Sequence, residues 1–379
     1  MPHDDRDHMR HALRLAARAI GRVHPNPVVG CVIVQQGTVI GHGFHHRAGE
    51  PHAEIEALRR AGERACGSSV YVTLEPCVHY GRTPPCVSAL IAARVAQVHV
   101  AMIDPNPKVA GQGVAALRAA GIEVSVGLCQ SEAEALNAPF TTWITQGRPL
   151  VTLKSALSLD GKMATHSGES QWITSPEARQ WGHRMRDQHD MVMTGIGTVC
   201  HDDPRLNCRW PRGRDPIRLV VDSRLRMPDH AAILSSSTTA PLWLAVSDQA
   251  NIDRWPLLQQ QLTAPGSRLL SCRTTVNGQV DLVDLLSQLG TAGITSLLCE
   301  TGYRLSAAML AQRLVDRIAL FLAPRLIGGQ EAAGLLATGV SQLSQTPWID
   351  AVTSRWVGGD LLVTGSVRYP VAEAPCLPA

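Results

Sequence analysis

The chain has 379 residues, of which 45% are hydrophobic and 18% charged, and 35 basic residues face 32 acidic ones. This composition excludes a disordered chain, and the even charge argues against nucleic acid as a partner. No apolar run approaches the ~18 residues of a membrane span, and the charged start MPHDDRDHMR is unlike a signal peptide, so we expect no membrane association. The ten scattered cysteines then indicate reduced thiols and a cytoplasmic location.

Alternating helix and strand patterns run through the first part of the chain. A helix capped by Asp7 is expected to place Met9, Leu13, Ala16 and Ile20 on one face. Another helix should begin near Pro51-His52. This alternation is typical of α/β layer architectures. The remaining elements are expected as strands at 28–34, 38–44, 69–74, 97–103 and 122–126, and helices at 87–94 and 113–120.

The pattern breaks near Gly147 and Pro149, which are typical punctuating residues. We therefore predict one domain over 1–146 and a second over 147–368, followed by a loose tail at 369–379. The second domain is expected to contain a further strand–helix series, with strands at 151–158, 191–197, 217–222, 242–246, 294–300 and 317–327.

A metal-binding constellation lies in the first domain. His52, Cys77 and Cys86 are three ligands of the kind that zinc prefers, and three protein ligands leave an open position for water. Zinc lowers the pKa of such a water to about 7. Glu54 lies two residues from His52 and is suited to move protons without binding the metal. A His-x-Glu followed by Pro-Cys…Cys is typical of zinc-dependent base deaminases, although here eight residues separate the two cysteines.

The second domain is less explicit when its residues are considered alone. Gly195-Ile196-Gly197-Thr198 follows a predicted strand, and this turn is compatible with either phosphate binding or a simple strand-to-helix connection. Glu300-Thr301-Gly302 lies between a predicted strand and a helix, where a dinucleotide pyrophosphate can rest on helix N–H groups. Neither segment matches the Gly-x-Gly-x-x-Gly fingerprint of Rossmann domains.

Three segments identify a family. PCVHYGRTPPC (76–86), HPNPVVGCVI (24–33) and HHRAGEPHAE (45–54) closely resemble the deaminase half of bifunctional riboflavin-biosynthesis deaminase–reductases. The resemblance implies a cytidine-deaminase-like α/β/α domain that deaminates 2,5-diamino-6-(5-phosphoribosylamino)pyrimidin-4-one through zinc-activated hydroxide, with Glu54 shuttling protons. It further implies substrate contacts from Asn26, His45, His79 and Arg82.

Segments 151–164, 170–174, 183–209 and 314–329 resemble the reductase half of the same family, which is similar in fold to dihydrofolate reductase. This resemblance implies NADPH-dependent reduction of the ribosyl side chain of 5-amino-6-(5-phosphoribosylamino)uracil to ribityl, and a homodimer or homotetramer. Arg186 and Arg209 suit the substrate phosphate. By matching positions, the substrate set is Lys154, Ser170, Arg186, Leu206, Arg209 and Glu300, and the cofactor set is Ala156, Trp172, Thr198, Asp202 and Gly302.

Three alternatives stay open at this point. A deaminase of nucleic-acid bases shares the zinc chemistry but leaves the second domain unexplained. A deaminase with a non-catalytic second domain finds support in Thr301, because most relatives have a small residue after the glutamate. A structural zinc protein requires a fourth ligand, for which His79 is the only nearby candidate. A second departure is Val78, where family members commonly have Ser.

Overall fold

The computed structural model describes residues 4–78, 85–107, 109–234, 239–262, 264–329, 331–335 and 339–370. It divides into two compact units, Met1–Pro149 with Gly290–Thr295, and Leu150–Leu289 with Ser296–Ala379. The expected boundary at 146/147 therefore lies just before the observed one, and the return of 290–295 to the first unit was not expected. One reason for that return is Trp143, whose indole N–H donates to the Gly290 carbonyl at 2.8 Å.

The first unit is built on a five-stranded sheet with the order β2-β1-β3-β4-β5. β1 is antiparallel to both β2 and β3, whereas β3, β4 and β5 run parallel. The carboxyl ends of these parallel strands meet at one edge, where α/β proteins bind ligands. The strands are β1 (Gly30–Gln35), β2 (Thr38–Phe44), β3 (Ser69–Val72), β4 (Gln97–Val100) and β5 (Glu123–Val126).

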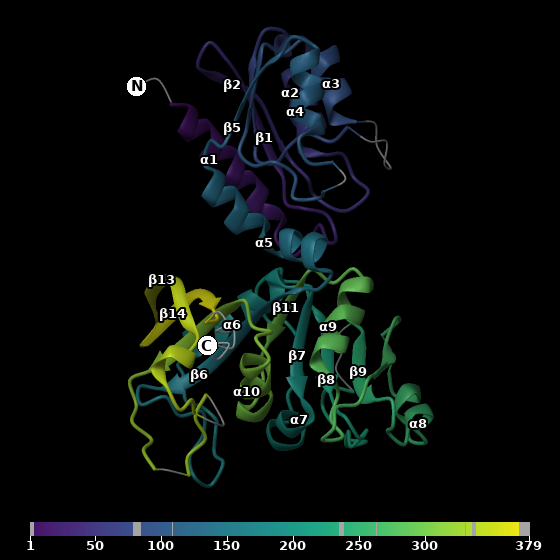
Figure 1. Cartoon of the computed structure of the whole chain (residues 1–379), viewed down its shortest axis with the longest axis vertical. Coiled ribbons are helices and arrows are strands. Elements are labelled where there is room, and N and C mark those ends of the chain that lie inside the picture. Colours follow the sequence, from purple (N-terminus) through teal and green to yellow (C-terminus); the bar gives the residue numbers. More distant parts are fainter. Residues whose placement is uncertain are drawn as a thin grey trace, which may run out of the picture. The chain divides into compact units, whose positions relative to one another are not determined.

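Helices cover both faces of this sheet, so the unit is an α/β/α sandwich (Figure 1). On one face, buried side chains of α2 (Ala53–Ala61), α3 (Cys86–Ala92) and α4 (Gln112–Ala119) form a core cluster with the strands. On the other face, α1 (Asp5–Ala16) and α5 (Gln130–Gln146) form a second cluster. The first helix begins before the expected cap, because Asp4 rather than Asp7 is its N-cap residue, and it ends before Ile20.

Two glycines of β2 allow α2 to lie directly on the sheet. A Cβ atom at Gly41 would come within 2.3 Å of the Ala57 carbonyl oxygen, and one at Gly43 within 2.6 Å of the Ala53 carbonyl oxygen. Any side chain at either position would therefore displace the helix. This contact fixes the start of α2, where His52 is the N-cap residue and Glu54 lies in the first turn.

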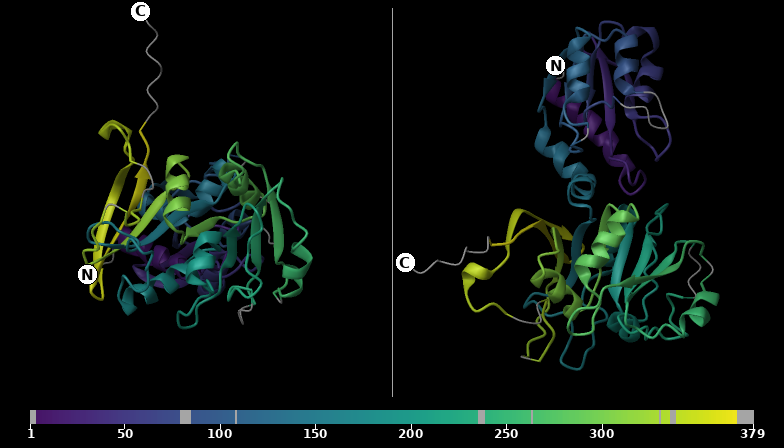
Figure 2. Two further views of the ribbon diagram at one scale, coloured as in Figure 1. Left: turned by 90° about the horizontal axis from the view of Figure 1, so that it is seen from below. Right: turned by 45° about the vertical axis from the view of Figure 1, so that its right-hand side comes forward.

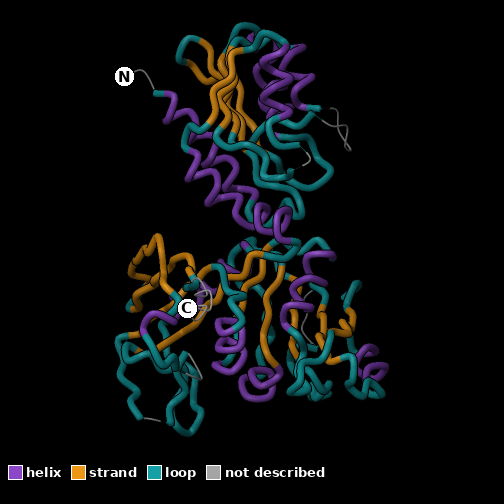
Figure 3. The backbone as a smooth tube through the Cα atoms, viewed as in Figure 1, coloured by secondary structure: helices purple, strands orange, loops and turns teal. Residues whose placement is uncertain are grey.

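The second unit contains a nine-stranded sheet with the order β10-β9-β8-β7-β11-β6-β12-β14-β13. Seven of these strands are parallel, and only β14 and β13 join in antiparallel fashion. The strands are drawn in orange in Figure 3. The strands are β6 (Leu150–Ser158), β7 (Met191–Gly195), β8 (Ile217–Val221), β9 (Leu242–Ser247), β10 (Arg268–Cys272), β11 (Ser296–Cys299), β12 (Arg317–Ala323), β13 (Trp348–Val357) and β14 (Asp360–Arg368).

The strands of this unit alternate with helices through most of its length, as the α/β prediction required. Several strands are shorter than expected: β7 ends at Gly195 because α7 begins at Ile196, and β12 ends at Ala323 rather than at 327. None of the helices in the described part of the chain combines the length and apolar character needed to cross a bilayer. The helices are α6 (Pro176–Gln188), α7 (Ile196–Asp202), α8 (Trp255–Gln260), α9 (Leu282–Thr291) and α10 (Tyr303–Ala311).

The predicted tail at 369–379 is described only in its first two residues. The Tyr369 hydroxyl accepts a hydrogen bond from the Val315 N–H at 3.2 Å and donates one to the Val315 carbonyl at 3.0 Å. The packed structure therefore extends through Tyr369, and 371–379 lie outside the described residues.

Candidate active sites

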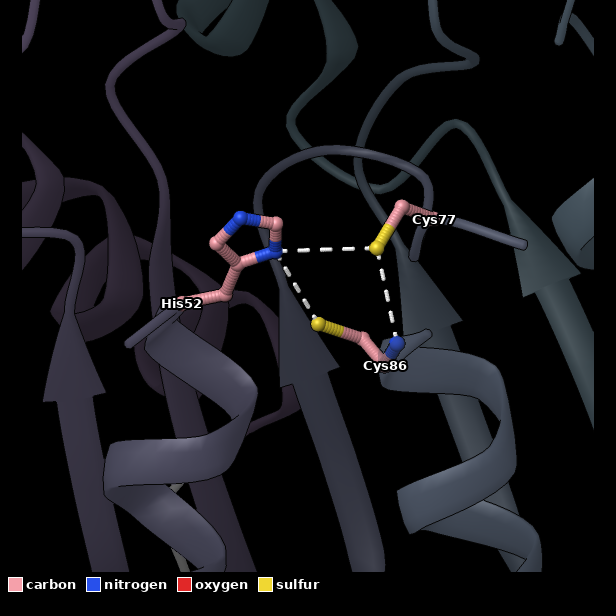
Figure 4. A group of neighbouring side chains, drawn as sticks. All are labelled: His52, Cys77 and Cys86. Atoms are coloured by element: carbon pink, nitrogen blue, oxygen red, sulfur yellow. Dashed lines mark hydrogen bonds between the residues drawn. The ribbon is translucent and has the colours of Figure 1, made fainter. Parts of the chain in front are cut away.

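His52, Cys77 and Cys86 come together at the edge of the first unit's sheet (Figure 4). The His52 Nδ1 atom lies 3.2 Å from the Cys86 Sγ and 3.6 Å from the Cys77 Sγ, and all three potential ligand atoms lie within 4.8 Å of one another. His52 precedes α2, Cys86 begins α3, and Cys77 follows the strand β3. One imidazole and two thiols converging at these distances fit a tetrahedral zinc ion with one position open.

The surroundings favour a thiolate in this cluster. A hydrogen bond with the Cys86 side chain, supported by others from His52 and from the Cys86 backbone N–H, lowers the pKa of Cys77 to about 4. The same interaction with Cys77, together with burial, raises the pKa of the Cys86 thiol. Metals bind the thiolate form of cysteine. A cation bound by Cys77 and Cys86 would therefore displace the proton that remains on the pair.

Glu54 lies beside these ligands, and only 3% of the residue is exposed. Burial raises the pKa of its carboxyl group to about 7. A carboxyl group with a pKa near neutrality exchanges protons efficiently in both directions, as a general acid–base catalyst must. It lies in the first turn of α2, two residues after the N-cap residue His52.

Two of the four expected deaminase substrate contacts lie together near the cluster. The Asn26 amide nitrogen lies 3.0 Å from His45 Nε2, and the Nδ1 atom of the same ring lies 3.1 Å from the Pro51 carbonyl oxygen. The His45 and His52 rings meet edge to face, with centroids 5.3 Å apart. His79 and Arg82, the other two expected contacts, lie outside the described residues.

A buried ion cluster occupies the second unit. The Glu300 carboxylate accepts two hydrogen bonds from Arg186, at 2.6 and 3.0 Å, and lies 3.3 Å from the Lys154 ammonium. Burial favours the protonated acid, but the charge of Arg186 and then that of Lys154 outweigh it and hold the Glu300 pKa below its usual range. The structure thus brings together three residues of the expected substrate set.

Arg186 has partners on both sides. Besides Glu300, its guanidinium donates to the Asn207 carbonyl at 2.8 Å. Arg209 is more open and donates to the Asn207 side chain at 2.9 Å. Leu206, the neighbouring member of the expected set, is buried with a φ of 52°. Of the two arginines expected to bind phosphate, Arg209 is therefore the one with the freer guanidinium.

Two of the five expected cofactor residues lie just after the carboxyl ends of neighbouring parallel strands. Thr198 follows β7 and Gly302 follows β11, and a Cβ atom on Gly302 would lie 3.4 Å from the Thr198 hydroxyl. Asp202 accepts a hydrogen bond from Ser170 at 3.0 Å. Trp172 is 59% exposed and lies beneath the Arg179 guanidinium. It therefore does not belong to the buried core. Ala156 is half-buried in β6.

The side chain of Thr301, the departure noted above, is buried within the unit. Its hydroxyl lies 2.8 Å from that of Ser306, one turn into α10, and the residue is only 6% exposed. The side chain therefore fills a place inside the unit.

Sequence reasoning missed three polar residues at these sites. Glu75 is buried and accepts four backbone N–H groups, and Asn207 links both arginines. His183 lies on α6, and burial with the nearby charges of Arg186 and Arg209 lowers its pKa to about 4. Glu75 had a signal in the sequence, since it directly precedes the Pro-Cys of the metal motif, whereas the other two had none.

The two sites define a class of protein: a zinc-dependent deaminase joined to a nucleotide-dependent reductase. Two family models match, the RibD C-terminal domain over 149–361 and the cytidine and deoxycytidylate deaminase zinc-binding region over 2–102. The chain belongs to the RibD family of bifunctional riboflavin-biosynthesis enzymes, whose reductase domain uses NADPH.

Relatives from distant bacteria match almost throughout. The riboflavin biosynthesis protein RibD of Escherichia coli is 44% identical, covering 94% of this chain and 98% of its own, and that of Aquifex aeolicus is 39% identical, covering 95% and 97%. A solved structure of Acinetobacter baumannii RibD is 39% identical with a TM-score of 0.85, covering 96% of this chain and 99% of its own. The expected fold, a deaminase-like domain followed by a reductase-like domain, is confirmed.

Proposed function

We propose that the first domain deaminates 2,5-diamino-6-(5-phosphoribosylamino)pyrimidin-4-one, with His52, Cys77 and Cys86 as the zinc ligands. The observation that carries this proposal is the convergence of these three donors within 4.8 Å, beside the buried Glu54. Zinc held there supplies a hydrolytic nucleophile at neutral pH. A solved Thermotoga maritima homologue, 32% identical with a TM-score of 0.84, is described as a diaminohydroxyphosphoribosylaminopyrimidine deaminase and 5-amino-6-(5-phosphoribosylamino)uracil reductase.

Glu54 moves the protons of this reaction. With a pKa of about 7 it accepts a proton from the attacking water and delivers one to the departing amino group. Asn26 and His45, whose side chains are hydrogen-bonded to each other, orient the pyrimidine ring beside it. His79 and Arg82 complete the substrate contacts in this proposal.

The second domain reduces the ribosyl side chain of the deaminated product to ribityl. NADPH supplies the hydride, so the protein's own task is to position the two partners. The sugar contacts the ion cluster formed by Lys154, Arg186 and Glu300. Arg209 binds the 5-phosphate. Ser170 and Leu206 complete the substrate set, while the cofactor contacts are Ala156, Trp172, Thr198, Asp202 and Gly302.

The test uses the full-length, zinc-loaded protein with the undeaminated pyrimidinone phosphate and NADPH in one sample. Ammonia release is expected first, and NADPH oxidation is expected to follow it. Ammonia without NADPH oxidation would show that the second domain is not catalytic, even though Thr301 is turned inward. If neither signal appears, the substrate assignment is wrong and deamination of a nucleic-acid base becomes the alternative to test.

We also propose a homo-oligomer in the cytoplasm. The nine described cysteines are all free thiols, as in a reducing compartment. The edge strand β13 carries Trp348 and Trp356, each 70% exposed. With β14 it forms the yellow hairpin in Figure 2. Unpaired strand edges are templates for pairing with another chain, and a twofold axis allows two identical edges to pair.

Substituting Lys for both Trp348 and Trp356 is therefore expected to reduce the mass of the particle measured by light scattering. The added charges block pairing at the strand edge. Leu257→Lys, at another exposed apolar residue, is the control and should leave the mass unchanged. An unchanged mass in the double variant would contradict the role of β13.

A further inference from the structure

Glu75 connects the metal-binding segment to a helix that contributes no ligand. Its residue is only 6% exposed, and it lies between the strand β3 and the ligand Cys77. One carboxylate oxygen accepts the N–H groups of Asp104 at 3.1 Å and Gly111 at 2.9 Å, and the other accepts those of Gly113 at 2.7 Å and Val114 at 3.1 Å. Each oxygen is thus held by two donors, and these donors belong to one segment of backbone.

This segment includes the start of α4, whose N-cap residue is Gly111 and therefore has no side chain to cap it. The first N–H groups of a helix have no partner within the helix. Glu75 supplies the missing acceptor from a position distant in the sequence, and its negative charge lies at the positive end of the helix. The cap and the metal motif therefore depend on one carboxylate.

The backbone next to the ligand also lies directly against α4. A Cβ atom on Gly113 would come within 2.2 Å of the Pro76 carbonyl oxygen and 3.0 Å of the Glu75 Cγ. Only glycine permits this approach. Because Pro76 is bonded to Cys77, the helix supports the backbone of the metal ligand itself.

The other side of Cys77 is held by α3. The Cys86 N–H donates to the Cys77 Sγ at 3.4 Å, and the Val87 N–H donates to the Cys77 carbonyl at 3.2 Å. Cys77 therefore lies between two helix starts, one acting on its sulfur and carbonyl and the other acting through Glu75 and Pro76.

We infer that Glu75 is a positioning residue for the zinc site, which orients Cys77 by tying its segment to the start of α4. This inference rests on the proposed zinc ligands. Residues that orient metal ligands through a second layer of hydrogen bonds typically change metal affinity 10–100-fold when substituted. Glutamine at this position keeps the shape but presents an NH₂ group to two backbone donors, so that two N–H groups lose their acceptor.

The test measures zinc affinity of the full-length protein by competition with a chromophoric chelator. Glu75→Gln is expected to weaken zinc binding about 10–100-fold, and excess zinc is expected to restore part of the deaminase activity. Cobalt(II) substituted for zinc reports the ligand geometry directly, and its absorption bands should shift in the variant. Glu63→Gln, an exposed glutamate of the same unit, is the matched control and should change neither measurement.

Two further variants keep the outcomes distinct. Gly113→Ala retains the carboxylate but displaces Pro76, so it should also weaken zinc binding, and it tests the attachment of the Cys77 segment to α4 if Glu75→Gln fails to fold. Cys77→Ala should abolish zinc binding; if it does not, the ligand assignment itself is wrong. If Cys77→Ala loses zinc while Glu75→Gln keeps wild-type affinity and cobalt spectra, Glu75 only caps α4 and the inference is overturned, whatever Gly113→Ala does.

Discussion

Glu54→Gln is expected to lower the rate of ammonia release about 10²- to 10⁴-fold, which is the range that a positioned acid–base group contributes. The amide has nearly the same shape but cannot accept and return a proton. Since Glu54 is not one of the three residues whose ligand atoms converge, the zinc content of the variant should remain at the wild-type level. The measurement is ammonia release from the undeaminated substrate, with zinc determined in the same preparation.

The bifunctional chain provides an internal control for this variant. NADPH oxidation should stop when the undeaminated compound is supplied but proceed normally when 5-amino-6-(5-phosphoribosylamino)uracil is added. Glu56→Gln, on the same helix, removes only a surface ion pair with Arg59 and should retain deaminase activity. Ammonia release at the wild-type rate in Glu54→Gln would exclude Glu54 as the proton carrier.

Glu300→Gln is expected to reduce the free energy of unfolding of the reductase unit by about 3–5 kcal/mol and to abolish reduction, because two largely buried cations lose their shared anion. Hydrogen exchange at the amides of β6 and β11 measures this stability within the full chain. Combining Glu300→Gln with Arg186→Gln should recover part of the loss, since one unpaired charge is then removed. Equal exchange rates in wild type and Glu300→Gln would contradict the prediction.

The same ion cluster predicts a dependence on acid. The pKa of Glu300 is lower in the folded protein than in the unfolded chain, so its stabilising contribution is complete above the ordinary value of 4.5 and is lost as the pH falls toward the folded value. The wild-type unit should therefore lose stability below about pH 4.5, and Glu300→Gln should lack this component of the loss.

The zinc ligands could be predicted because their motif is short and combines unusual residue types. Interactions between distant segments could not. Arg186 and Glu300 lie 114 positions apart, and although both were assigned to the substrate set, nothing in the sequence indicated that they pair with each other. The phosphate role expected of Arg186 therefore passes mainly to Arg209 in our proposal.

The helix α5 was not among the elements expected from the sequence, and it shows how a buried polar residue obscures the apolar periodicity of a helix. Asn137 lies on its buried side, only 1% exposed, where its amide exchanges hydrogen bonds with the backbone N–H and C=O of Val28 at 2.9 and 3.0 Å. A polar residue on the core face interrupts the apolar periodicity by which helices are recognised. Its partner lies 109 positions away, so the compensating contact is invisible in the local sequence.

The return of Gly290–Thr295 to the first unit affects the order in which a ribosome can complete this protein. Domains generally fold as units during synthesis, with the N-terminal one first. Here the deaminase unit is finished only after most of the reductase unit has been translated, and until then the Trp143 indole lacks its acceptor on Gly290. The hydrogen bond between Trp143 and Gly290 therefore forms only after the chain has been translated past Gly290.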